Sequence, residues 1–447
     1  MTTADATAAA QIPLSRPEFK KRHIAAVVIG NALEFYDFLT YSFFSVYIGR
    51  AFFPSTEGRE SLLLSLATFG IGFVARPIGG IVIGTMGDRI GRKPAMVLSF
   101  TLMGIAITGL ALTPSYATIG IAAPILVVIF RLLQGFALGG EVGPTTAFLV
   151  EAAPPQHRGF YSSLQYTTQD LAILTAGIVG TVLASYMNEQ ELQDWGWRIA
   201  MLLGALIVPF GLALRRSLPE SLHAADDAAL APDATAGTIT RFERLRPYLR
   251  IAVLGLIMLA GGTMVSYVIN YLTTYALDSL HLAAQYAFGA TVTSGLCGVL
   301  LEPVSGWLSD RYGRKPVMMI PWALLLITVL PAFALMDQLR TAEALYGATA
   351  VLAILAALAT PPVLTSISES LPPSIRSGTL AIIYAFAISI FGGSTQFTVT
   401  WLIDVTGNPL APAWYSMAAV IIGLIAMIGL RESAPIKQKP EKGSSRL

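Results

Sequence analysis

Long apolar stretches separated by short polar connections occupy the chain from residue 23 to residue 431. A helix that crosses a membrane needs about 20 mostly apolar residues, and each stretch is close to that length. The pattern therefore predicts twelve membrane-spanning helices, which we expect at 23–49, 62–86, 95–113, 118–149, 159–187, 197–216, 248–278, 284–308, 317–336, 344–369, 376–404 and 412–431.

The stretch 218–247 interrupts this pattern, because it is rich in Ala, Asp and Arg and has no apolar run. A segment of this composition is typical of a linker between domains. We therefore expect five parts, which are a cytoplasmic N-terminal tail at 1–22, a six-helix half at 23–217, a cytoplasmic linker at 218–247, a second six-helix half at 248–431 and a cytoplasmic C-terminal tail at 432–447.

Composition agrees with a membrane protein. The chain is 54% hydrophobic and 13% charged, with a mean hydropathy of +0.64, which is too apolar for an ordinary soluble domain. The net charge of +2 and the scattered basic residues give no reason to expect a nucleic-acid partner. The single cysteine, Cys297, excludes an intramolecular disulfide, and the histidines lack metal-ligand spacing, so we expect neither a metal nor a cofactor.

The basic residues also predict the orientation. Most lysines and arginines fall in connections on one side of the predicted membrane, whereas the other side has little beyond Arg50, Arg59, Arg198 and Arg340. Since positive charge gathers on the cytoplasmic side, both termini are expected in the cytoplasm. An odd number of helices would destroy this segregation.

One polar tract occurs twice. Gly84–Pro94 reads GTMGDRIGRKP and Gly306–Pro316 reads GWLSDRYGRKP, and Asp88 and Asp310 are 310 − 88 = 222 residues apart. A repeat at half the chain length indicates two related halves in parallel order. Within the first tract, Gly91 permits a tight turn, and Asp88 can cap a helix and pair with Arg92.

The repeated pattern Gly-x-x-x-Asp-Arg-x-Gly-Arg-Lys resembles the major facilitator superfamily of secondary transporters. The resemblance implies an all-α membrane protein with twelve transmembrane helices in two six-helix halves related by pseudo-two-fold symmetry. It also implies that the tracts hold the cytoplasmic ends of the halves together. The alternative is that they only set topology and packing. The expected gating residues are Asp88, Arg89, Arg92, Asp310, Arg311 and Arg314.

Several ionisable residues fall inside predicted spans, where charge is costly and usually functional. Asp37 and Glu34 lie on one face of the first helix, and Arg131 and Glu141 lie on one face of the fourth. Asp37 and Arg131 are both expected roughly 20 Å from a helix end, which suggests that they pair. The alternative is a purely structural ion pair.

These four residues form the expected proton-coupling set. We expect Asp37 to take up a proton from the outside, release Arg131 for a substrate carboxylate and lose the proton inside; Glu34 is the alternative carrier. Arg76, deep in the second helix, adds a second cation and so predicts an anionic substrate. Its alternative role is to pair with a carboxylate or to reach toward the membrane surface.

Uncharged polar residues on predicted helices complete a possible cavity, although each could instead join two helices. With the two arginines, the expected substrate-binding residues are Arg76, Arg131, Gln134, Gln165, Gln169, Tyr267, Asn270, Tyr271, Tyr384 and Gln396.

A closer resemblance extends over nearly the whole chain. It rests on GNALEFYDFLTYSFFSVYIGRAFFP from Gly30, RPIGG, RLLQGFALGGEVG, RGFYSSLQ, WGWRI and RRSLPES. These stretches are similar to the metabolite:proton symporter branch of the superfamily, and the first half and IFGGST at Ile390–Thr395 look most like its citrate and tricarballylate carriers.

The resemblance implies proton-coupled uptake of a di- or tricarboxylate, not an enzyme activity, by a monomer in the bilayer of the bacterial inner membrane. Its partners would be a small anionic substrate and protons. Carriage of α-ketoglutarate, shikimate, proline or betaine, or a sensor that transports nothing, are the alternatives.

Overall fold

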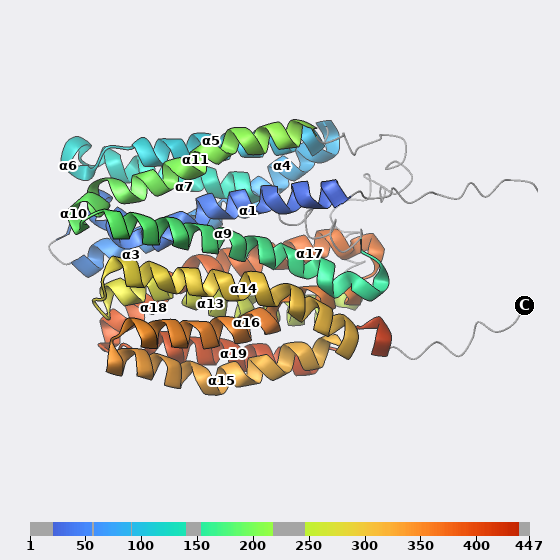
Figure 1. The fold of residues 1–447 in the computed structure, drawn as a ribbon. Coiled ribbons are helices and arrows are strands. Elements are labelled where there is room, and N and C mark those ends of the chain that lie inside the picture. The colour runs from blue at the N-terminus through green and yellow to red at the C-terminus, as the bar shows by residue number, and fades with distance from the viewer. Residues whose placement is uncertain (1–20, 56–57, 91, 140–152, 218–245, 438–447) are drawn as a thin grey trace, which may run out of the picture.

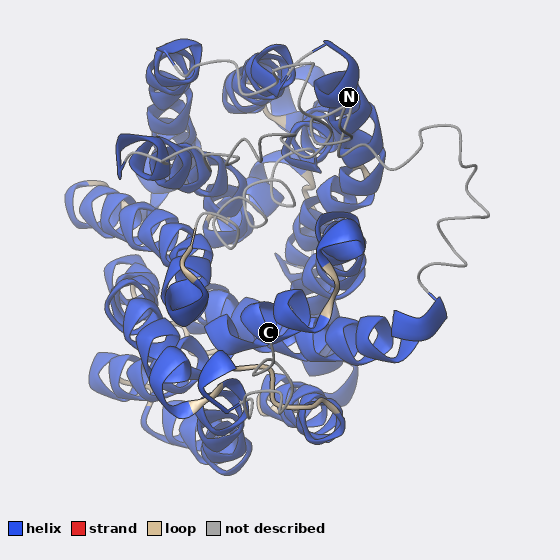
Figure 2. Ribbon diagram, turned by 90° about the vertical axis from the view of Figure 1, so that its right-hand side faces the viewer, coloured by secondary structure: helices blue, strands red, loops and turns tan. Residues whose placement is uncertain are grey.

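The computed structural model describes residues 21–55, 58–90, 92–139, 153–217 and 246–437. Every regular element in these ranges is a helix, and the long helices run side by side in one bundle (Figure 1, Figure 2). Nine of the described helices are long and apolar enough to cross a membrane. The expected all-helical membrane fold is confirmed. Most of the predicted tails at 1–22 and 432–447 and of the predicted linker at 218–247 lies outside the described residues.

The helices coincide with the apolar stretches, within a few residues at most ends. Up to Ser217 they are α1 (Lys21–Phe43), α2 (Ser45–Phe52), α3 (Gly58–Val74), α4 (Arg76–Ile90), α5 (Arg92–Leu112), α6 (Tyr116–Ile119), α7 (Ala122–Gly139), α9 (Arg158–Tyr186), α10 (Glu189–Glu191) and α11 (Trp197–Ser217). From Leu249 they are α13 (Leu249–Asp278), α14 (Ala284–Tyr312), α15 (Arg314–Leu339), α16 (Ala342–Ser370), α17 (Pro373–Ala387), α18 (Gly393–Thr406) and α19 (Ala411–Gly429), with short single turns at 155–157, 192–196, 246–248, 388–392 and 435–437.

Three predicted spans are interrupted helices. The first contains α1 and α2, the second contains α3 and α4, and the eleventh is divided by the wide π-helical turn Ile388–Gly392. The break before α4 arises from Pro77, which has no backbone N–H to donate and whose ring crowds the preceding turn. This break brings Arg76 to the first position of a new helix, deep in the bundle.

The bundle is polar inside and apolar outside. Its outer surface exposes large side chains such as Ile81, Ile121, Leu206, Ile327 and Ile425. A soluble protein would bury many of these, but hydrocarbon tails solvate them equally well. The interior holds charged side chains instead, among them Asp37, Arg76, Arg131 and Glu302.

Two groups of helices meet along the middle of the bundle. Helices α1 to α11 pack with one another, as do α13 to α19, and the groups touch where α9 lies along α14 and where α3 lies along α18 (Figure 1). Glycines make the approach close: a Cβ added at Gly306 or Gly393 would crowd backbone or side-chain atoms of the other group. Small residues at helix crossings are typical of membrane bundles.

The second polar tract forms the connection from α14 to α15. Gly313 separates the two helices with φ of 103°, a left-handed conformation that costs a glycine little. Arg314 then begins α15. Of the first tract, the helix bounds are described but the side chains of Asp88, Arg89 and Arg92 are not.

Candidate substrate cavity and gates

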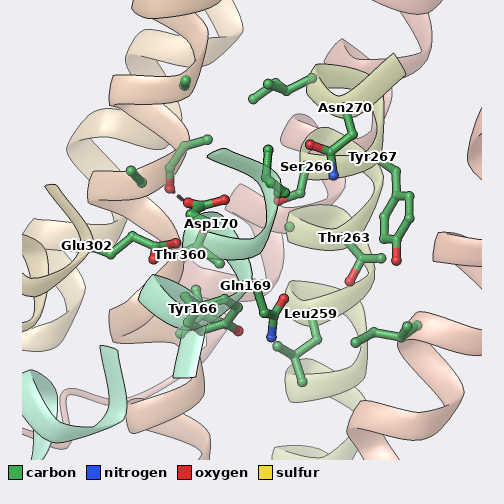
Figure 3. A pocket seen from close by; sticks show the side chains of 18 of the residues that line it. Tyr166, Gln169, Asp170, Leu259, Thr263, Ser266, Tyr267, Asn270, Glu302 and Thr360 are labelled. Atoms are coloured by element: carbon green, nitrogen blue, oxygen red, sulfur yellow. Dashed lines mark hydrogen bonds between the residues drawn. The ribbon is translucent and has the colours of Figure 1, made fainter. Parts of the chain in front are cut away.

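A cavity of about 100 Å³ lies between the two groups of helices. Side chains from α1, α4, α9, α13, α14, α16 and α17 line it, so neither group forms it alone (Figure 3). Its polar lining consists of Arg76, Tyr166, Gln169, Asp170, Thr263, Ser266, Tyr267, Asn270, Ser294, Glu302, Thr360 and Tyr384.

Half of the expected substrate-binding residues meet in this cavity. They are Arg76, Gln169, Tyr267, Asn270 and Tyr384. The amide of Gln169 on α9 donates to the hydroxyl of Tyr384 on α17 over 3.3 Å, so this pair joins the two groups of helices across the cavity.

The other expected ligands lie elsewhere and hold helices together. Gln165 contacts Asn31 at 3.4 Å, Tyr271 accepts from Thr400 at 2.9 Å, and Gln396 accepts from Ser42 at 2.7 Å. Arg131 and Gln134 bond to each other, and neither lines the cavity. The contacts of Gln165, Tyr271 and Gln396 each join two helices, as the packing alternative expects.

Arg76 is the cation of the cavity lining. Its side chain is 6% exposed, and its guanidinium lies 4.2 Å from the centre of the Phe73 ring and 4.3 Å from that of Phe38. The ring faces attract the cation without using its N–H donors. In the described part of the chain, Nε and Nη2 have no hydrogen-bond partner. Two donors on one edge of a buried guanidinium match the two oxygens of a carboxylate.

Arg131 is buried within the same aromatic cluster, but both of its terminal nitrogens have hydrogen-bond partners. Its Nη1 donates to Gln134 at 2.7 Å and its Nη2 donates to the carbonyl of Phe69 at 3.2 Å. The ring of Phe38 lies 4.3 Å from this guanidinium as well as from that of Arg76. One aromatic ring thus contacts both cations.

The expected ion pair between Asp37 and Arg131 is not among the contacts of Arg131 in the described residues. Asp37 is buried, and its carboxylate lies against Gly204 of α11, where an added Cβ would overlap Oδ1. Consecutive residues of a helix point about 100° apart. Phe38 therefore faces Arg131 while Asp37 faces α11.

At one end of the cavity, which we call the Asp310 end, the second polar tract joins the two groups of helices. Asp310 accepts from the backbone N–H of Gly159 at 2.8 Å and of Phe160 at 3.0 Å, at the start of α9. A carboxylate is favourable there because the helix N-terminus carries partial positive charge. Arg314, fully buried, pairs with Asp310 at 2.7 Å and with Glu369 at 2.9 Å.

Arg311 does not take part in this contact. Its guanidinium lies over the rings of Trp307 and Tyr312 on its own helix, at 5.6 and 5.7 Å. Glu432 contributes instead, accepting from the backbone N–H of Arg314 and Lys315 at the start of α15. Although burial opposes the charged form, these backbone donors outweigh it and lower the pKa of Glu432.

At the other end, which we call the Arg59 end, an ion-pair cluster joins the groups. Arg59, at the start of α3, lies 3.7 Å from Asp278 of α13 and 3.5 Å from Asp404 of α18. All three are partly exposed, so each pair contributes little on its own. The described conformation therefore has contacts between the two groups at both ends of the cavity.

Sequence reasoning missed several lining residues, above all Tyr166 and Asp170. An acid in the middle of an apolar run was the available signal for Asp170. Glu302, in the apolar run that precedes Pro303, carries the same signal. Glu141 and the side chains of Glu34, Asp88, Arg89 and Arg92 lie outside the described residues.

Comparisons with known proteins agree with this architecture. The family model of sugar and other transporters matches residues 23–231, and that of the Major Facilitator Superfamily matches residues 287–446. A citrate-proton symporter of Salmonella typhi is 36% identical over 90% of this chain and 92% of its own length. A proline/betaine transporter of Escherichia coli is 30% identical over 95% of this chain and 85% of its own length. The solved xylose transporter XylE from E. coli superposes with a TM-score of 0.75 at 18% identity, covering 92% of this chain and 98% of its own.

Proposed function

This chain belongs to the major facilitator superfamily, a fold of twelve transmembrane helices, and from that premise we propose that it carries a di- or tricarboxylate into the cell together with protons. Its similarity to a citrate-proton symporter over nearly the whole of both chains supports a transporter of this kind. The relatives and the family are transporters, and nothing in them indicates an enzyme.

The observation that carries the proposal is Arg76. A buried guanidinium with Nε and Nη2 unpartnered in the described residues, in a cavity shared by both groups of helices, is a site for an anionic group. The amides of Gln169 and Asn270 and the hydroxyls of Tyr267 and Tyr384 supply further donors. Ligand pockets usually exceed roughly 300 Å³, so this cavity of about 100 Å³ has to widen as the halves move apart.

The test is uptake of labelled citrate by proteoliposomes, with Arg76→Lys as the variant. A lysine keeps the charge but cannot make the two parallel contacts to a carboxylate. Loss of one charge-assisted hydrogen bond costs about 1.5–3 kcal/mol, so we expect the apparent KM for citrate to rise about tenfold to a hundredfold. Arg198→Lys is the matched control, because Arg198 donates to the carbonyls of Ala111 and Thr113 outside the cavity. An unchanged KM in Arg76→Lys would contradict the proposal.

A zwitterion such as proline or betaine is the second candidate. The cavity contains Asp170 and Glu302 besides Arg76, and the proline/betaine relative covers most of this chain. Competition of unlabelled proline, betaine and α-ketoglutarate against citrate separates the candidates. If only the zwitterions compete, the carboxylate proposal is wrong in its substrate class.

For proton coupling we propose Asp37 as a carrier, with Glu34, Glu141 and Arg131 as the associated groups. Burial of Asp37 in an interior shared with Arg131 supports this role. Asp37→Asn should abolish citrate accumulation driven by a pH gradient while citrate exchange without a gradient continues. Accumulation at the wild-type level would exclude Asp37.

We further propose that the chain is a monomer in the bacterial inner membrane, with both termini and the Asp310 end in the cytoplasm. The segregation of lysine and arginine supports this orientation. In this orientation the Asp310 contact is a cytoplasmic gate and the Arg59 cluster is an outer gate.

A further inference from the structure

Two acidic side chains face each other across the boundary between the two groups of helices. Asp170 on α9 and Glu302 on α14 both point into the cavity and lie close together there (Figure 3). Both line the cavity, and Glu302 is 5% exposed. The roles proposed above for Arg76 and Asp37 make no use of this pair.

The contact itself has a chemical requirement. A carboxylate can only accept hydrogen bonds, so two carboxyl groups bond to each other only if one of them carries a proton. Two like charges in an interior with little water cannot both persist. Two acids that face each other in this way are therefore expected to share a single proton as O–H···O⁻ and to titrate as a unit.

Few charged or titratable groups surround the two acids. The charged or titratable groups that line the same cavity are Arg76 of α4, Tyr166 of α9, Tyr267 of α13 and Tyr384 of α17, and α1 and α16 contribute apolar residues and Thr360. Cys297 of α14 precedes Gly298, whose Cα lies against the carboxylate of Asp170. Phenols are neutral near pH 7, so Arg76 carries the permanent charge among these groups. Arg76 is also the residue that we propose binds the substrate.

Close backbone packing holds the two acids together. A Cβ added at Gly298 of α14 would overlap the carboxylate of Asp170, and one added at Gly295 would overlap the backbone of Leu174 on α9. No room remains between α9 and α14 at this level for an intervening side chain. Any motion that separates the two halves here must move Asp170 away from Glu302.

We propose that Asp170 and Glu302 bind one proton between them and that this proton stabilises the closed contact between the halves. The proton enters from solvent when the halves are apart on the outside, bridges the two carboxyl groups on closure and leaves when the halves separate on the inside. Without it, two hydrated carboxylates favour separation.

This proposal rests on the proposed function in one respect, which is the anionic substrate. An anion on Arg76 adds negative charge to the same cavity and so favours the protonated pair. Proton and anion then bind cooperatively, and by linkage each tightens the other by the same factor. The pair would thus contribute coupling in addition to any contribution from Asp37.

The decisive measurement needs no substrate. Spin labels at Gln156 and Tyr312 report the Asp310 end, and labels at Tyr186 and Tyr286 report the Arg59 end, in a Cys297→Ser background that removes the chain's one cysteine. All four labelled positions are exposed. Distances from double electron–electron resonance then give the ratio of closed to open molecules as a function of pH.

One coupled proton changes such a ratio by at most about tenfold per pH unit. We expect the closed fraction to rise as the pH falls in the parent protein. In Asp170→Asn/Glu302→Gln the amides can bond without a proton, so the ratio should depend less steeply on pH than in the parent. A double variant with the parent's pH slope would overturn the proposal.

Two further variants serve as an alternative and as a control for this measurement. If the double variant does not fold, Asp170→Asn alone keeps the shape of the side chain and should flatten the same curve; an unchanged slope in it overturns the proposal equally. Asp337→Asn removes an acid that pairs with Arg340 on the surface of α15, and it should keep the parent's slope.

Citrate transport separates this inference from the proposed function. In the double variant, citrate accumulation driven by a pH gradient should fall relative to citrate exchange without a gradient, and an unchanged ratio of accumulation to exchange would overturn the pair's role. If the wild-type protein neither exchanges nor accumulates citrate, the proposed substrate is wrong, and the pH slope of the distances still decides the role of the pair.

Discussion

Removal of Asp310 should open the Asp310 end of the protein. Its carboxylate accepts two backbone hydrogen bonds from the start of α9 and pairs with the buried Arg314. In Asp310→Ala the backbone N–H groups of Gly159 and Phe160 lose their acceptor, and Arg314 loses one of its two carboxylate partners. Because Glu369 still pairs with Arg314, we expect a cost at the lower end of the range for a broken buried ion pair, about 3 kcal/mol.

A change of this size is large for a two-state equilibrium. Moving a population from 1:99 to 99:1 takes about 5.5 kcal/mol, so a loss of about 3 kcal/mol turns a closed form present at about 99% into one near parity. Asp310→Asn should have a smaller effect, because the amide oxygen still accepts one hydrogen bond although the charge is lost.

Double electron–electron resonance between spin labels at Gln156 and Tyr312 measures this population directly. We expect the long-distance component to grow strongly in Asp310→Ala and moderately in Asp310→Asn. The control is Asp337→Asn, whose exposed pair with Arg340 contributes less than about 1 kcal/mol. If Asp310→Ala has the distance distribution of the control, the tract does not hold the two groups together and our reasoning about this end is refuted.

Three further substitutions test other contacts. Gly204→Ala places a methyl group where the carboxylate of Asp37 lies, so pH-driven citrate accumulation should fall about tenfold or more. Gly347→Ala, which has open space at its Cβ, is the control and should behave as wild type. Equal activity of the two variants would exclude Asp37 from the coupling site. Glu432→Gln should lower the melting temperature at pH 7. The lowered pKa of Glu432 stabilises the folded state above the ordinary carboxyl pKa, and this stabilisation is lost as the pH falls through the folded-state pKa, so the difference from wild type should shrink with falling pH; a difference that does not depend on pH would contradict the capping role. Arg59→Ala should increase the long-distance component between labels at Tyr186 and Tyr286 by only a few-fold, because the ion pairs of Arg59 are partly exposed and screened. In the wild-type protein, 0.5 M salt should reproduce most of this effect.

The spans and the repeated tract could be predicted from sequence because each depends on a local property. A membrane-spanning helix satisfies its own backbone hydrogen bonds, so its position is set by a run of apolar residues and needs no partner. The expected 248–278 and the observed α13, Leu249–Asp278, differ by one residue at the start. The turn at Gly313 likewise depends on the conformational freedom of a single residue.

The direction in which a side chain points within the bundle depends on its neighbours. Depth along a helix can be counted from its end, but rotation about the helix axis is set by packing. Tyr267 and Asn270 face the cavity, whereas Tyr271 turns to Thr400 of α18. In the eleventh span the π-helical turn at Ile388–Gly392 adds a residue to one turn and changes the rotation of α18 relative to α17, so Tyr384 reaches the cavity and Gln396 does not.

The sequence by itself determined the helices, the repeat, the polar tract and the presence of deep cations. Only the tertiary structure decided which charges meet. Asp170 and Glu302 are 302 − 170 = 132 residues apart on helices from different groups, and no local pattern links them. Their proximity arises because glycines let α9 and α14 approach closely. Arg131 bonds to Gln134, and its guanidinium faces the ring of Phe38, whereas Asp37 faces α11. Such contacts depend on the relative rotation of packed helices, which the packing of the whole bundle sets.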